Sequence, residues 1–239
     1  MKKILTFLIA TLLMVQLGFH SARAETITVV VIDSGIDASN PHLCKFGHKS
    51  FVKRLPDPLS DEYGHGTHVA GLISSTAGEG NYCLVSIKYY DERASGKENL
   101  KSSLEALQYA IDIKAKFINF SGGGPEFVED EYLLIKKALS KHIKLVMAAG
   151  NEHDNLDKVC NYYPACYDTR IVMVGNLEIT ENYGKSPSPS SNYGNRVTRW
   201  EVGTNLESTL PGGKTGYKSG TSQACAVASG KLLREILRK

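Results

Sequence analysis

Three residues along this chain have the types and the order needed for attack by a serine hydroxyl. Asp33 follows an apolar run, His65 opens His65-Gly66-Thr67-His68, and Ser222 stands in Gly220-Thr221-Ser222-Gln223-Ala224. A neutral serine hydroxyl is a poor nucleophile and needs an adjacent base, which histidine can supply. An aspartate that orients the imidazole and stabilises its protonated form completes such a set. The order Asp, His, Ser is one of the known orders of this triad and differs from the α/β-hydrolase order.

Some of these residues also have structural interpretations. Asp33-Ser34-Gly35 by itself is typical of an ordinary turn at the end of a strand. His65 and His68 have a spacing that suits metal ligands, but no third ligand or matching carboxylate accompanies them, so we expect no metal here. We interpret His68 as a structural histidine.

The elements that must position these residues are strands and helices in alternation. Short apolar runs predict strands at 28–32, 84–89, 117–120, 143–149 and 171–174. Leucine and isoleucine at helical spacing from Leu100 to Ile111, and acids followed by lysines over 129–141, predict two helices. A further helix is predicted over 222–237. This alternation predicts an α/β fold with a mainly parallel central sheet flanked by helices.

Polar residues follow three of the predicted strands at the point where each strand ends. They are Asp33, Ser121 and Asn151. Open α/β sheets place their sites at the carboxyl ends of the strands, so we expect the three residues to lie near one another. The polar stretch 185–191 is predicted to be an exposed loop, and neither an interdomain linker nor an internal repeat is evident.

The first 24 residues have the pattern of a secretory signal peptide. Lys2 and Lys3 precede an apolar run over 4–19, and Ala22-Arg23-Ala24 matches a small-residue cleavage site. The run is short for a membrane span, so we predict cleavage near Ala24 and no stable membrane anchor. The mature domain would be 25–239, secreted or periplasmic. Cleavage removes three of the 28 basic residues and none of the 25 acidic ones, and the balanced charge argues against a nucleic-acid partner.

Five cysteines in an exported chain suggest disulfides. Cys160 and Cys166 flank a short loop and are predicted to pair. Cys44 and Cys83 would pair if the loop after the first strand passes the start of the apolar run at 84–89. Cys225 is left over. We favour a small buried apolar residue there over a reactive thiol.

Five sequence blocks resemble those of the subtilisin family (subtilases) of serine proteases. In chain order they are Asp33-Ser34-Gly35, His65-Gly66-Thr67-His68-Val69-Ala70-Gly71, Ser121-Gly122-Gly123-Gly124, Ala148-Ala149-Gly150-Asn151, and Ser208-Thr209-Leu210-Pro211-Gly212 with Gly220-Thr221-Ser222. Each block is weak alone, but five in the correct order over 28–230 are a specific signal. The resemblance implies a three-layer subtilisin-like fold and a serine endopeptidase that cuts polypeptides through an acyl-enzyme intermediate.

The resemblance also implies a role for each catalytic residue. Ser222 would be the nucleophile, His65 the general base and later the general acid, and Asp33 the residue that orients His65. Asn151 would donate a hydrogen bond to the oxyanion, together with the backbone N–H of Ser222. An esterase is disfavoured because Ser222 does not stand in a G-x-S-x-G elbow.

Further residues match the substrate-binding segments of the family. Ser121, Gly122 and Gly123 resemble the edge that pairs with an extended substrate as an added strand. Ala148 and Gly150 would line the pocket for the side chain that precedes the cut bond. Two interpretations of Glu152 stay open: a charge at the rim of this pocket that favours a basic residue, or an ordinary solvated charge.

The chain departs from the family in ways that concern folding. Relatives usually carry a propeptide, whereas Glu25-Thr26-Ile27 alone separates the predicted cleavage site from the first strand. We therefore expect either unaided folding or a helper or inhibitor acting in trans. His42 stands where calcium-binding relatives have aspartate, and the loop after Gly71 lacks their calcium-binding insertion, so no strong calcium site and no other cofactor is predicted. Ala226 replaces the usual proline. We expect a monomer; a protease-like binding protein without turnover remains the rival hypothesis.

Overall fold

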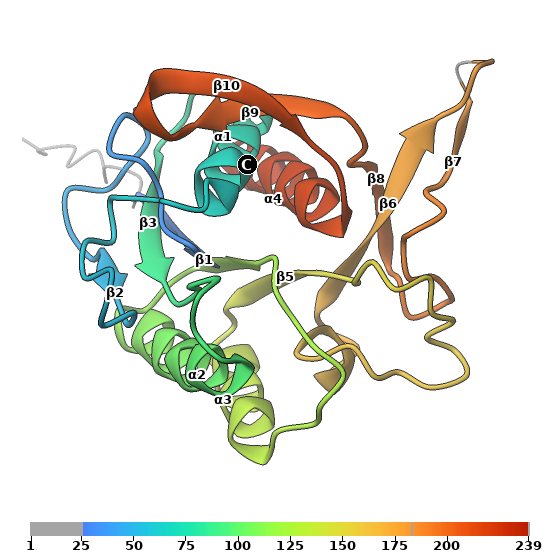
Figure 1. Ribbon diagram of the computed structural model, residues 1–239, viewed down its shortest axis with the longest axis horizontal. Coiled ribbons are helices and arrows are strands. Elements are labelled where there is room, and N and C mark those ends of the chain that lie inside the picture. The colour runs from blue at the N-terminus through green and yellow to red at the C-terminus, as the bar shows by residue number, and fades with distance from the viewer. Residues whose placement is uncertain (1–25, 183, 239) are drawn as a thin grey trace, which may run out of the picture.

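A central sheet of eight strands is the middle layer of the computed structural model, which describes residues 26–182 and 184–238 (Figure 1). Its strands are β1 (Ile27–Asp33), β2 (Lys49–Ser50), β3 (Tyr82–Lys88), β4 (Phe117–Phe120), β5 (Lys144–Ala148), β6 (Val172–Ile179), β7 (Lys185–Pro187) and β8 (Arg199–Val202). They are ordered β2-β3-β1-β4-β5-β6-β7, and β8 also pairs with β6. The β6–β7 pair is antiparallel and the other pairs are parallel, as predicted.

Helices cover both faces of the sheet (Figure 1). They are α1 (His65–Ala77), α2 (Gly96–Asp112), α3 (Glu129–Ser140) and α4 (Thr221–Leu237). A separate antiparallel hairpin, β9 (Leu206–Leu210) and β10 (Lys214–Lys218), lies over α1. The three-layer α/β fold expected from the sequence is therefore confirmed.

The strand β1 shows why both faces of the sheet are buried. Successive side chains of a strand point to opposite faces. Val30 and Ile32 pack in the core with α2 and α3, whereas Val29 and Val31 pack in the core with α1 and α4. An uninterrupted apolar run is therefore what a central parallel strand requires.

The predicted strands agree with the structure to within about two residues except toward the C-terminal part of the sheet, and the helix predicted from Leu100 begins earlier, at Gly96. The strand at 117–120 is found as predicted, but the strand predicted at 171–174 continues to Ile179. The prediction of a loop over 185–191 was wrong in part, because residues 185–187 form β7 at the sheet edge. Pro187 is tolerated there because an edge strand does not need every N–H group for pairing.

Both predicted disulfides are formed. Cys44 is bonded to Cys83 with their Cα atoms 4.9 Å apart, and Cys160 is bonded to Cys166 with 5.6 Å between the Cα atoms. The first bond forms because the loop that carries Cys44 pairs with β3 near its start. Cys225 is a free, fully buried thiol, and burial raises its pKa to about 12. The interpretation of Cys225 as a buried apolar residue is confirmed.

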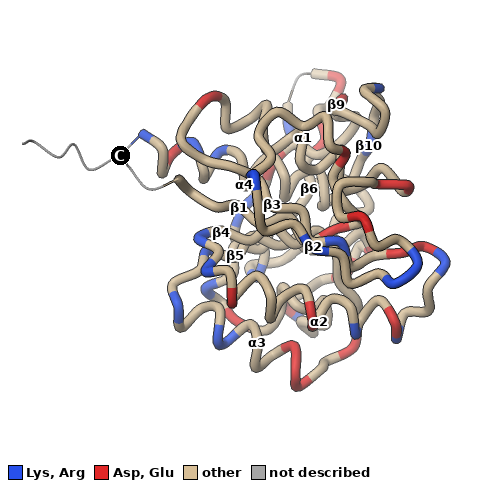
Figure 2. Tube along the Cα trace, turned by 90° about the vertical axis from the view of Figure 1, so that its left-hand side faces the viewer, with Lys and Arg blue, Asp and Glu red and all other residues tan. Residues whose placement is uncertain are grey.

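Acidic and basic residues are mixed along the chain rather than gathered by sign over α2 and α3 (Figure 2). Within residues 26–182 and 184–238, no helix combines the length and apolarity that a membrane crossing would need. The predicted signal peptide at 1–24 lies outside the described residues.

A buried carboxyl group in the first turn of α3 leads to a prediction about stability. Glu131 is 5% exposed, and burial raises its pKa from 4.5 to about 7. Between these values the folded protein holds a proton that the unfolded chain has released, so stability falls as the pH rises. Glu131→Gln removes this penalty. We expect it to be more stable than the parent by roughly 3 kcal/mol above pH 7, and equally stable below pH 4.5.

Urea unfolding at pH 4.5 and pH 8, in the Ser222→Ala background to prevent self-digestion, measures this difference. Glu129→Gln is the matched control, because Glu129 is exposed in the same helical turn. The prediction is wrong if the free energies of unfolding of the two glutamine variants change with pH in the same way.

Candidate active site

Asp33 and His65 meet at the carboxyl edge of the sheet. Asp33 is the last residue of β1 and His65 is the first residue of α1. The His65 Nδ1–H donates to Asp33 Oδ1 at 2.8 Å, and Asp33 is 5% exposed. Burial lowers the pKa of His65, but the charge and the hydrogen bond of Asp33 outweigh it, so the pKa is raised overall. The Nε2 atom of His65 is thereby left as the one available to act as a base.

Asp61 fixes the start of the helix that carries His65. Its Oδ1 accepts from Gly64 N at 2.8 Å, and its Oδ2 accepts from Thr67 N at 2.7 Å and from Thr67 Oγ1 at 2.6 Å. An aspartate that accepts from the first N–H groups of a helix stabilises that terminus. Sequence reasoning missed Asp61, although an aspartate just before a helix start is a recognised signal.

Ser34 links this cap to the catalytic aspartate. Its hydroxyl lies 2.8 Å from Asp61 Oδ1 and 3.2 Å from Asp33 Oδ1, and it accepts from Gly66 N at 3.0 Å. Its backbone N–H donates to Asp33 Oδ1 at 2.8 Å. The Asp33 oxygen that accepts from His65 is therefore also held by Ser34.

Ser222 lies in the first turn of α4, which packs against α1. Its hydroxyl donates to the backbone carbonyl of Ser121 at 3.0 Å. Among the described residues no hydrogen bond joins Ser222 to His65. A hydroxyl hydrogen bond of this kind can change partner by rotation about one side-chain bond, and catalytic hydrogen bonds often form only when substrate is present.

Asn151 follows β5 and is joined to the residue before Ser222. Its Oδ1 accepts from Thr221 N at 2.9 Å and lies 3.2 Å from Thr221 Oγ1. Within the described chain its Nδ2 donates to no other group. The amide oxygen therefore anchors Asn151 at the start of α4 and leaves the N–H groups available to an oxygen bound there.

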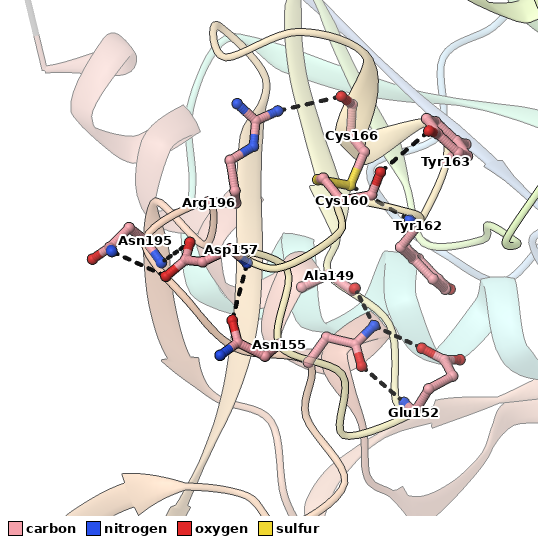
Figure 3. Close-up of a disulfide and its surroundings, with 11 residues drawn as sticks. Ala149, Glu152, Asn155, Asp157, Cys160, Tyr162, Tyr163, Cys166, Asn195 and Arg196 are labelled. Carbon is pink, nitrogen blue, oxygen red and sulfur yellow. Dashed lines mark hydrogen bonds between the residues drawn. A yellow bond between two sulfur atoms is a disulfide. The ribbon is translucent and has the colours of Figure 1, made fainter. Parts of the chain in front are cut away.

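Asn192 shapes the loop that presents Asn151, and nothing in the sequence signals this role. It is 1% exposed, and its Nδ2 donates to Ala149 O at 2.8 Å and to Glu152 Oε2 at 2.7 Å. Its Oδ1 accepts from Glu152 N at 3.1 Å and from Asp154 N at 2.8 Å. Figure 3 shows the contacts at Ala149 and Glu152 beside the second disulfide. The Glu152 carboxylate is thus hydrogen-bonded, although the residue is exposed.

The predicted substrate-binding residues lie on two sides of Ser222. Ser121 directly follows β4 and contacts Ser222, while Gly122 and Gly123 continue this segment. Gly150 follows β5 and has a φ of 99°, which favours glycine. Ala148 is 1% exposed and packs in the core with α1 and α4, so its side chain is a core group.

His68 has a structural position, as the sequence suggested. It is 0% exposed, and its Nε2 lies 3.1 Å from the carbonyl oxygens of Leu206 and Gly216 in the hairpin. Burial lowers its pKa, so the neutral ring is favoured and its N–H ties β9 and β10 to α1.

His42 is one of the residues on which the expectation of no strong calcium site depends. It replaces the aspartate of calcium-binding relatives and stacks on Tyr82 with 4.8 Å between ring centroids. Across the described ranges, no three His, Cys, Asp or Glu side chains are grouped so that they could hold a metal ion. Independence from metals stays a prediction of the sequence.

Comparison with known proteins identifies the family. Residues 24–234 match the peptidase S8 (subtilase) family, and the chain belongs to it. It is 34% identical over 227 residues to an intracellular serine protease of Paenibacillus polymyxa, covering 90% of this chain and 68% of that protein. It is 33% identical over 213 residues to subtilisin E of Bacillus subtilis (strain 168), covering 86% of this chain and 54% of that protein.

Solved structures agree with this assignment. A cold-adapted subtilisin-like serine proteinase superposes with a TM-score of 0.73 at 26% identity, covering 90% of this chain and 77% of that one. The protein is therefore a subtilisin-like serine endopeptidase that acts on polypeptides.

Proposed function

We propose that this protein is an exported endopeptidase that cuts peptide bonds through an acyl-enzyme formed at Ser222. The observation that carries the proposal is the 2.8 Å hydrogen bond between His65 and Asp33, beside a serine at the start of a helix that packs on α1. This arrangement supplies a base, the group that orients it and a nucleophile.

The proposed reaction has two stages, formation of the acyl-enzyme and its hydrolysis. The Ser222 Oγ attacks the peptide carbonyl carbon while His65 Nε2 takes the hydroxyl proton, and the imidazolium is stabilised by Asp33. The C–N bond then breaks, and His65 gives that proton to the leaving amine. Water repeats the sequence on the ester and releases the acid.

Charge develops on the former carbonyl oxygen in each stage. The Nδ2 of Asn151 and the backbone N–H of Ser222 are the proposed donors to this oxyanion. The bonds of Asn151 to Thr221 support the proposal, because they orient the amide before substrate arrives. The segment from Ser121 to Gly123 would pair with the extended substrate backbone.

The disulfides and the N-terminal sequence of this chain support export, whereas the names of two relatives do not. Two relatives are named intracellular serine proteases. The two disulfides favour an oxidising compartment, and the pattern ending at Ala22-Arg23-Ala24 favours cleavage by a signal peptidase. We propose that the mature enzyme is secreted or periplasmic and acts as a monomer without a metal. It either folds unaided or uses a helper or inhibitor that acts in trans.

The experiment uses the full mature chain, 25–239. A fluorophosphonate probe should label the wild type, and mass spectrometry should place the adduct on Ser222, while casein is degraded. In Ser222→Ala the labelling should be lost, and casein degradation should fall by about 10⁶-fold. Labelling without casein cleavage would favour an esterase or a protease-like binding protein, and a folded wild type that resists labelling would refute the proposal.

Asn151→Asp tests the oxyanion donor separately. Aspartate keeps an oxygen to accept from Thr221 but has no N–H to donate. We expect kcat to fall by at least about 10²–10³-fold with little change in KM, because the lost interaction is made in the transition state; the magnitude is the one measured for this donor in subtilisin. A rise in KM as large as the expected fall in kcat, with kcat itself unchanged, would contradict the assignment of Asn151 as the oxyanion donor.

A further inference from the structure

The chain segments that continue β4 and β5 leave a gap beside Ser222. The two strands are neighbours in the sheet, with Phe120 opposite Met147. Their continuations, 121–124 and 149–152, form the two sides of this gap, and Ser222 contacts the first of them through Ser121. We call the space between these two segments the acyl-side gap.

The proposed function decides which part of a substrate meets this gap. The carbonyl carbon must lie at Ser222, its oxygen at Asn151, and the backbone before it along 121–123. The residue that carries this carbonyl therefore lies between the two segments. Its side chain, which precedes the cut bond, points into the acyl-side gap.

Tyr162 fills the gap from side to side. A Cβ atom on Gly123 would lie 2.6 Å from Tyr162 Cε1, and a Cβ atom on Gly150 would lie 2.6 Å from Tyr162 Cδ2. These two ring atoms are on opposite edges of the aromatic ring. The ring thus lies against both segments. It is one of the groups that leave no room for a side chain at Gly123 and Gly150, together with Tyr163 O at the first position and Asn192 and Glu152 at the second.

The position of Tyr162 is fixed by its own loop. The Cys160–Cys166 disulfide closes this loop, and Tyr162 N donates to Cys166 Sγ at 3.4 Å. The next residue, Tyr163, exchanges two backbone hydrogen bonds with Gly124, of 2.9 and 2.8 Å, which join the loop to the first segment. The backbone that carries the Tyr162 ring is therefore held in place beside the first segment.

The polar end of the gap is already paired. Figure 3 shows the side chain of Tyr162 directed toward Glu152. The Glu152 carboxylate accepts from Asn192 at 2.7 Å, and burial followed by the charge of Glu152 raises the pKa of Tyr162. A lysine or arginine from a substrate would meet a carboxylate that already accepts from Asn192.

We propose that Tyr162 restricts the residue before the cut bond to small side chains, namely glycine, alanine and serine. This inference rests on the proposed function of the same site and names its substrate class. It favours small residues over the basic ones that an open path to Glu152 would select.

The test compares Ala-Ala-Pro-X p-nitroanilides with X as alanine, phenylalanine or lysine. For the wild type we expect kcat/KM with alanine to exceed that with phenylalanine or lysine at least about tenfold, since even one methylene that does not fit changes specificity by this much. Tyr162→Gly should raise the phenylalanine-to-alanine ratio at least about tenfold. Tyr162→Phe, which keeps the ring, should leave the ratio as in the wild type.

Controls separate the alternatives. Tyr132→Ala removes a ring of the neighbouring aromatic cluster on α3 and should not change the ratio. If Tyr162→Gly fails to fold, the wild-type preference and Tyr162→Ala still decide. An enzyme that prefers phenylalanine, or that prefers lysine and loses this preference in Glu152→Gln, overturns the inference. A wild type that no fluorophosphonate labels instead refutes the proposed function.

Discussion

Ser222→Ala is expected to lower kcat for peptide hydrolysis by about 10⁶-fold while KM changes little. The variant has no hydroxyl to attack the carbonyl carbon, so the acyl-enzyme cannot form. The magnitude is the one measured for loss of this serine in subtilisin. Some hydrolysis should remain, because Asn151 and the substrate-binding segments still bind and polarise the peptide. Initial rates on a p-nitroanilide, with each variant's fold checked by circular dichroism, measure the effect.

Cys225→Ala is the matched control for this variant. Cys225 lies three residues further along α4, and its thiol contacts Asn119 in the buried core. We expect it to keep turnover within about threefold, because a buried thiol whose pKa is about 12 does not attack substrates. If Cys225→Ala lost as much activity as Ser222→Ala, the assignment of the nucleophile would be wrong.

Asp33→Asn is expected to lower kcat by about 10⁴-fold and to change its pH dependence. The asparagine oxygen can still accept from Ser34 N and from His65 Nδ1, because in the parent Asp33 Oδ1 accepts from both. What is lost is the negative charge that stabilises the imidazolium.

The direction of the pH change follows from the two opposing influences on His65. Burial lowers its pKa, and the charge and hydrogen bond of Asp33 raise it above the ordinary value. Without the charge the pKa falls, so the acidic limb of the kcat profile should move to lower pH. Asp37→Asn is the control. The Asp37 carboxylate accepts from the backbone N–H groups of Ser39 and Gly212 rather than from His65, so this variant should not shift the acidic limb. A limb that moves to higher pH in Asp33→Asn would contradict this account.

The central strands and the triad candidates could be predicted because their signals are local. A central strand is buried on both faces, so it is apolar throughout, as Phe117–Phe120 is. Such a run can be recognised without knowing which strands lie beside it. The polar residues that end these strands share one edge because the strands are parallel. The short strand β7 was not predicted, because its residues pair only where β6 is long enough to receive them.

Residues that act through contacts across the chain were harder to find. Asn192 holds the loop of Asn151, yet it is an ordinary polar residue in its own sequence context. Glu152 illustrates the same limit. Its carboxylate accepts from Asn192, a partner 40 residues away in the sequence.

By itself, the sequence determined the order of Asp33, His65 and Ser222, the strands that carry polar residues to one edge, and the short loop between Cys160 and Cys166. These properties depend on residue type and spacing, which are written along the chain. Tertiary structure alone decided that Tyr162 fills the acyl-side gap and that the Ser222 hydroxyl rests on Ser121. Both depend on packing between segments remote in sequence, where a fraction of an ångström determines whether a side chain fits.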